Sequence, residues 1–183
     1  MKRLVLGVAV TLALAVPAGR AAAMSPGECA DLSIRIKLPE ASSAKCGGEN
    51  FGGGDQGSGR AEYIQIITGD SIFVVSHTSA GVRSYMRRLG VKDIIGNYSI
   101  FASTDNWGDE TESNDFTLRR FDAKLTGSGA KVLCVGFVHF SGHVASSTGY
   151  RHVISGYDCS FGATPPTDAR MDQLVGSIGY DFE

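Results

Sequence analysis

The chain has 183 residues, and its 17 basic and 19 acidic side chains give a formal net charge of −2. This length is enough for one domain that buries its own core. The excess of acidic residues argues against a nucleic-acid partner, because binding to the phosphate backbone requires clustered Lys and Arg.

The first 23 residues have the pattern of a secretory signal peptide. Lys2 and Arg3 precede an apolar run over residues 4–16, and residues 21–23 are alanines, the small residues that signal peptidase requires. The apolar run covers about 13 residues, whereas a membrane-spanning helix needs roughly 20. We therefore expect cleavage near Met24, no membrane anchor, and an exported protein of the periplasm or cell exterior. The mature chain keeps 14 of the 17 basic residues and all 19 acidic ones, a net charge of −5.

All four cysteines lie beyond the predicted signal peptide: Cys29, Cys46, Cys134 and Cys159. An even number of cysteines in an oxidising compartment predicts disulfides. Three pairings are open, and we favour Cys29–Cys46 with Cys134–Cys159 because each pair is close in sequence. A tetrathiolate zinc site is the alternative, but the sequence has no C-x-x-C spacing to supply paired ligands.

The exported part divides into an N-terminal segment, residues 24–60, and a larger α+β domain, residues 61–183. Apolar and polar residues alternate over residues 30–38, which predicts a half-buried strand. Seven of the thirteen residues 47–59 are glycines, which lose the most backbone entropy on ordering. We expect a disulfide-closed segment whose Gly-rich end is a flexible loop leading into the domain.

The next stretch predicts a hairpin and then a helix. Residues 63–67 and 72–76 are rich in β-formers and are separated by a short polar turn. Apolar residues then follow the i, i+3, i+4, i+7 spacing of a helix face: Val82, Tyr85, Met86 and Leu89. We expect a helix that Thr78 or Ser79 caps at its start, with Gly90 at its end in the left-handed conformation that ends many helices.

The second half of the chain consists mainly of predicted strands. Residues 94–103 and 116–125 have strand patterns and flank a polar, acidic loop. Residues 131–144 and 150–161 predict a long hairpin. If its turn is centred between residues 146 and 147, the numbers of opposed residues sum to 293. This register places Cys134 opposite Cys159.

A short helix is predicted near the C-terminus. Thr167 can cap it, and Met171, Leu174, Val175 and Ile178 have helical spacing. The order of elements lacks the regular β–α–β alternation of a parallel sheet. We therefore expect an α+β fold with a mainly antiparallel sheet, two short helices packed on one face, and stabilisation by disulfides.

Three of the four histidines lie in the long hairpin: His139, His143 and His152. In the predicted register they share one face of the sheet. His152 is diagonal to both others, roughly 7–8 Å away, so it and one of them could hold a metal ion. His139 and His143 are roughly 13 Å apart, which separates them from a common ion. The alternative is that all three are partly exposed strand residues, and we expect no cofactor.

The run Gly69-Asp70-Ser71-Ile72 follows an apolar segment. It resembles the first block of the GDS-type (SGNH) serine esterases, in which the serine is the nucleophile. The resemblance implies Ser71 as nucleophile. The family usually supplies the base and its carboxylate from an Asp-x-x-His block, and no aspartate here is followed by histidine three positions later.

These patterns favour a non-catalytic binding or interaction module with a protein or small-molecule partner. Two alternatives stay open: a secreted hydrolase that uses Ser71, and a metal or metabolite carrier that uses the histidine face. A deep polar pocket around a histidine and a carboxylate would favour an enzyme. A flat sheet face with exposed aromatic residues would favour the binding module.

Overall fold

A computed structural model describes residues 22–24, 26–52, 58–82, 84–144 and 149–182. Its helical elements are η1 (Pro26–Asp31), η2 (Pro39–Ser43), α1 (Val91–Ile95) and α2 (Asp168–Ser177), of which η1 and η2 are 3₁₀ helices. Its strands are β1 (Ala22–Met24), β2 (Ile34–Ile36), β3 (Lys45–Gly52), β4 (Ser58–Ile67), β5 (Ser71–Ala80), β6 (Met86–Arg87), β7 (Phe101–Asp105), β8 (Glu110–Ser113), β9 (Phe116–Leu125), β10 (Lys131–His143), β11 (Gly149–Ser160) and β12 (Ile178–Tyr180).

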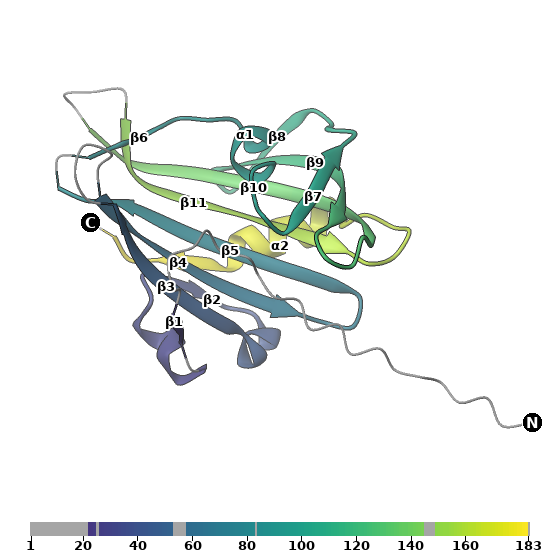
Figure 1. Cartoon of the computed structure of the whole chain (residues 1–183), viewed down its shortest axis with the longest axis horizontal. Coiled ribbons are helices and arrows are strands. Elements are labelled where there is room, and N and C mark those ends of the chain that lie inside the picture. The colour runs from purple at the N-terminus through teal and green to yellow at the C-terminus, as the bar shows by residue number, and fades with distance from the viewer. Residues whose placement is uncertain (1–21, 25, 53–57, 83, 145–148, 183) are drawn as a thin grey trace, which may run out of the picture.

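Within these residues, ten strands form one antiparallel sheet whose main path runs β1-β3-β4-β5-β11-β10-β9-β7. The short strands β6 and β8 pair with β11 and β9, and β2 pairs with β12 as a separate two-stranded sheet. Figure 1 shows the long strands β4, β5, β11 and β10 side by side. The prediction of a mainly antiparallel sheet is therefore confirmed.

The long hairpin has the predicted register. Cys134 lies opposite Cys159, and Ser141 lies opposite His152. The structure has two disulfides, Cys29–Cys46 with a Cα–Cα distance of 5.6 Å and Cys134–Cys159 with one of 4.1 Å. These are the pairs that the sequence favours. The first disulfide ties the segment around η1 to β3, and the second links the neighbouring strands β10 and β11.

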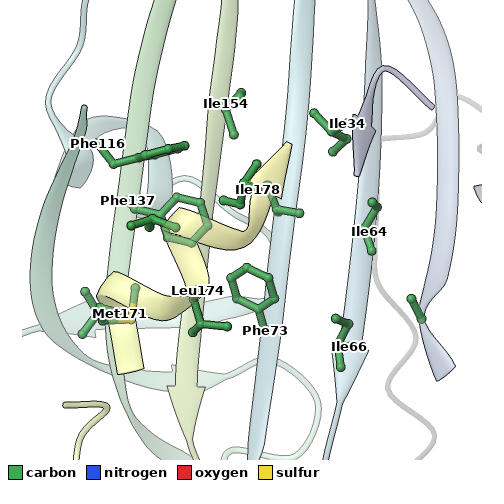
Figure 2. Packing of buried hydrophobic residues seen from close by; sticks show 14 of the residues in the cluster. Ile34, Ile64, Ile66, Phe73, Phe116, Phe137, Ile154, Met171, Leu174 and Ile178 are labelled. Carbon is green, nitrogen blue, oxygen red and sulfur yellow. The ribbon is translucent and has the colours of Figure 1, made fainter. Parts of the chain in front are cut away.

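Because successive strand residues point to opposite sides, the sheet has two faces, and each carries its own core. The face covered by α2, β2 and β12 is called the α2 face here. Figure 2 shows α2 and β12 lying over this face, with Met171, Leu174 and Ile178 beside Phe73 and Phe137. At the start of α2, the Thr167 hydroxyl accepts a hydrogen bond from the Arg170 N–H, as a capping residue does.

The opposite face, called the α1 face, packs against α1 and the segment that follows it. Val91 and Ile95 of α1 are fully buried there with Phe121 and Tyr157 of the sheet. The two helices therefore lie on opposite faces, and the expectation of two helices on one face is wrong. Both faces are apolar in the middle of the sheet, so each needs a cover.

The helix expected between Ser79 and Gly90 is not formed. Ser79 and Ala80 complete β5, residues 86–87 form β6, and Gly90 precedes α1 as its N-cap. β5 is paired on both sides, with β4 and with β11, and this ladder outweighs the local helical spacing. Of the apolar stripe that predicted the helix, Met86 alone packs against a core, whereas Val82 is 86 % exposed and Tyr85 and Leu89 are each 49 % exposed.

The Gly-rich stretch is mostly strand rather than flexible loop. Residues 47–52 belong to β3, and β4 begins at Ser58, so β4 crosses the boundary expected at residue 60. Residues 53–57 lie outside the described residues. At Gly47 a side chain would meet the Tyr63 ring at 2.4 Å, so glycine allows this aromatic ring to lie flat on β3.

Other strands differ from the sequence prediction in length. The alternating pattern of residues 30–38 yields only β2, because η1 and η2 flank it closely. Residues 94–95 belong to α1, and β7 starts at Phe101. Within the expected acidic loop, Glu110–Ser113 forms β8 against β9. β9 itself has the predicted bounds.

The predicted signal peptide, residues 1–23, lies almost entirely outside the described residues. Ala22 and Ala23 belong to β1, which pairs with β3. Among the described residues, no helix has the length and apolar character needed to cross a membrane.

Candidate functional site

A cavity of about 900 Å³ lies on the α1 face, between the sheet and the segment that runs from β6 to Ile100. Strand residues form one wall, among them Ala61, Val74 and Val153. Met86 and Ile94 belong to the covering segment and line the opposite side. A cavity of this volume, lined mainly by apolar side chains with a few polar groups, matches the usual binding site for a small molecule.

The alternation of side chains along the strands explains why space is left here. β5 turns Val74 and Ser76 toward the α1 face, and β11 turns Ser155 and Tyr157 the same way. The side chains of Ala61, Ser76 and Ser155 are small, so they fill little of the space between the sheet and the covering segment. A cavity therefore remains beside the packed part of the core.

Three hydroxyl groups meet in the cavity wall, and we call Ser76, Tyr98 and Ser155 the hydroxyl cluster. The Tyr98 oxygen lies 2.8 Å from the Ser76 oxygen and 2.8 Å from the Ser155 oxygen. The two serine oxygens are 3.2 Å apart, and the Ser76 hydroxyl also lies 3.0 Å from the Ser155 carbonyl. Burial raises the pKa of Tyr98, so its hydroxyl stays protonated at all ordinary pH values.

The rim of the cavity is more exposed. Leu89 lines it with 49 % of its surface accessible, and Arg87 beside it is also exposed. The Asn97 amide donates a hydrogen bond to the Asp93 carbonyl at 2.6 Å, which anchors the chain after α1. No carboxylate is among the described residues that line the cavity.

A second polar cluster lies on the α2 face and consists of Glu62, His77 and His152. His77 Nε2 and His152 Nδ1 are 3.1 Å apart, so one nitrogen donates a proton to the other. The Glu62 carboxylate lies 3.7 Å from His77 Nδ1. It accepts hydrogen bonds from the Ser33 N–H at 2.8 Å and pairs with Arg60 at 2.8 Å.

Both imidazoles of this cluster favour the neutral form. Burial lowers the pKa of His77, although Glu62 works in the opposite direction, and burial with the nearby Arg151 lowers that of His152. Phe182 stacks on both rings, with centroid distances of 4.4 Å to His77 and 4.3 Å to His152. Phe182 thus covers the pair, and the rings lie in packed surroundings rather than in an open cleft.

The other two hairpin histidines are not drawn into this cluster. His139 Nδ1 donates to the Asp115 carbonyl at 2.9 Å, and its Nε2 lies 3.3 Å from the Tyr180 hydroxyl. His143 packs edge-on against the ring of Tyr150. In the described part of the chain, no three His, Cys, Asp or Glu side chains are arranged to hold a metal ion. The structure therefore brings His152 to His77 instead of to His139 or His143.

Ser71, the nucleophile that the esterase resemblance implies, lies at the start of β5. Its hydroxyl is 2.9 Å from the Thr68 hydroxyl, which in turn bonds Asp70. The four histidines all lie within the described residues, and each has its ring contacts elsewhere. The structure thus places no histidine beside Ser71.

The sequence patterns did not single out the hydroxyl cluster or Glu62. A signal for two members was present, because Ser76 and Ser155 interrupt apolar stretches of two long strands. Ser155 is buried, and a buried serine needs a hydrogen-bond partner. The third member, Tyr98, is 22 residues from Ser76, and only the docking of the segment after α1 brings it there.

Comparison with protein-family models, with curated proteins and with solved structures finds no match to this chain. The functional argument therefore rests on the chemistry of the residues themselves.

Proposed function

We propose that this chain is an exported, non-catalytic binding protein that holds a small apolar ligand in the cavity of the α1 face. The observation that carries the proposal is the cavity itself, about 900 Å³ in volume and lined mainly by apolar side chains. The lining also holds a compact hydroxyl cluster, the kind of group that orients a ligand in a largely apolar site.

Export is supported by the signal-like N-terminus and by the two disulfides, which persist in oxidising compartments. The two alternatives have less support. A hydrolase needs a base beside its nucleophile, and a metal carrier needs at least one further ligand beside the His77–His152 pair.

A fluorescent apolar probe tests the proposal. N-phenyl-1-naphthylamine should bind the folded protein with a rise in fluorescence, because the cavity shields it from water. Ala61→Phe places a ring in the cavity from β4 and should weaken probe binding at least tenfold. Ala163→Phe is the matched control, since Ala163 is exposed and lies outside the cavity lining.

Circular dichroism should show that both variants keep the fold. Absence of probe binding to the wild-type protein contradicts the proposal. Equal binding by the wild type and Ala61→Phe contradicts it as well, because the probe would then occupy another surface.

A further inference from the structure

The hydroxyl cluster has a fixed supply of protons. Ser76, Tyr98 and Ser155 carry one hydroxyl proton each, and each hydroxyl oxygen can accept hydrogen bonds through its lone pairs. The three oxygens are 2.8 to 3.2 Å from one another, so each hydroxyl can donate to the next around a closed ring. Alternatively, Ser76 donates to the Ser155 carbonyl and the other two protons remain within the ring.

Both arrangements use all three protons and leave lone pairs free. A ligand that brings a hydrogen-bond donor can add a bond to the cluster without breaking one. A ligand that brings only an acceptor must displace an existing bond of the cluster, so it gains little. The hydroxyl cluster therefore recognises donors.

The apolar lining of the cavity limits which donor group a ligand can bring to the hydroxyl cluster. A protonated amine would lose its hydration in an apolar cavity, and no carboxylate among the described lining residues could compensate its charge. A carboxylate ligand could approach only the exposed Arg87 at the rim, where water screens the attraction. A neutral hydroxyl is the donor that fits both the cluster and the apolar walls.

We infer that the ligand is an apolar alcohol, a largely hydrocarbon molecule whose hydroxyl donates to the Ser76–Tyr98–Ser155 cluster. This inference rests on the proposed binding function and adds the chemical class of the ligand. The hydrocarbon part lies against the apolar walls formed by residues such as Val74, Val153 and Ile94.

Three probes of similar size test the assignment on the wild-type protein: 1-decanol, decyl methyl ether and decanoate. Each competes with bound N-phenyl-1-naphthylamine. We expect 1-decanol to displace the probe at about three- to tenfold lower concentration than the ether, the range of one net hydrogen bond. Decanoate should be weaker than 1-decanol.

Variants test whether the preference for 1-decanol over the ether depends on the hydroxyl cluster. Ser155→Ala removes one member of the cluster and should bring the affinity for 1-decanol close to that for the ether. Tyr98→Phe should act in the same direction if Ser155→Ala folds poorly. Ser79→Ala is the matched control, because it removes a serine hydroxyl from the same strand as Ser76 but outside the cavity lining. It should keep the preference for the alcohol.

The outcomes separate the two proposals. Equal displacement by alcohol and ether overturns the alcohol assignment and leaves apolar binding intact. Strongest displacement by decanoate overturns it too and indicates recognition at Arg87. If N-phenyl-1-naphthylamine itself does not bind, the binding function fails and the alcohol assignment fails with it.

Discussion

Asp158 is a buried carboxyl group beneath α2. One of its oxygens is 3.9 Å from the Arg170 guanidinium, and the other has no hydrogen-bond partner among the described residues. Burial raises the pKa of Asp158 to about 6, with Asp70 adding to the rise and Arg170 opposing it. The folded state therefore favours the protonated acid, and ionisation at neutral pH costs stability.

Replacing Asp158 with asparagine should stabilise the protein at pH 8. The raised pKa of Asp158 means that its contribution to stability is full below the unfolded value of 3.8 and is lost as pH rises through about 6. A shift of this size corresponds to roughly 3 kcal/mol, so we expect Asp158→Asn to gain about 1–3 kcal/mol in urea unfolding. Asp109→Asn, at an exposed position, is the control. No gain, or an equal gain in the control, would refute the role of burial.

The residues of the hydroxyl cluster show which features the sequence could predict and which it could not. The sequence correctly predicted a strand at Ser76 from a run of β-formers and a strand at Ser155 from the hairpin pattern. It could not bring Tyr98 to them, because that contact depends on how a distant segment packs. Likewise, Glu62 and His77 meet because β4 and β5 pair in a register that places them opposite each other.

At the scale of elements, α1 shows how tertiary contacts define a helix of only five residues. Such a helix is too short to be stable alone, so its packing must hold it. Gly136 of β10 makes this packing possible. A side chain there would meet Val91 at 3.0 Å and Ile95 at 3.1 Å.

Gly136→Ala should therefore loosen α1 and the cavity wall that follows it. We expect a loss of about 1–3 kcal/mol in the free energy of unfolding, the usual cost of overpacking, together with weaker binding of N-phenyl-1-naphthylamine. Gly69→Ala is a suitable control, since a side chain there meets nothing within 4 Å. If Gly136→Ala and Gly69→Ala have equal stability, α1 does not depend on the close approach.

Tertiary contacts also explain why the helix expected before α1 does not form. Val82, Tyr85 and Leu89 have helical spacing, but spacing stabilises a helix only where a core receives its apolar face. The ladder of β5 with two neighbours uses the residues that would start such a helix. α2, by contrast, begins at the predicted cap and buries Met171 and Leu174 in the core.

At the scale of the whole molecule, the sequence could predict the central hairpin but not the layering around it. The hairpin register follows from local turn position and from the numbering of Cys134 and Cys159. Which face each helix covers depends on contacts between segments far apart in sequence. The separate two-stranded sheet is such a case, because it joins β2 near one end of the chain to β12 near the other.

The buried histidines and the buried Asp158 change the stability of the protein in opposite directions as pH falls. Burial lowers the pKa of His77, so its contribution to stability is present above the unfolded value of 6.5 and is lost as pH falls below it. Burial lowers the pKa of His152 as well, which adds to this loss. Asp158, whose pKa burial raises to about 6, contributes more as pH falls over the same window.

The two effects act in opposite directions as pH falls below about 6.5, so each opposes the other in the free energy of unfolding of the wild-type protein. Asp158→Asn removes the contribution that grows in acid, and its stability should fall as pH decreases. His77→Phe removes part of the opposite contribution while keeping a ring against Phe182, and its stability should rise as pH decreases. Urea unfolding at several pH values measures all three curves. If the three stability curves are parallel, neither Asp158 nor His77 sets the pH dependence. Slopes of opposite sign in the two variants would show that both residues contribute to it.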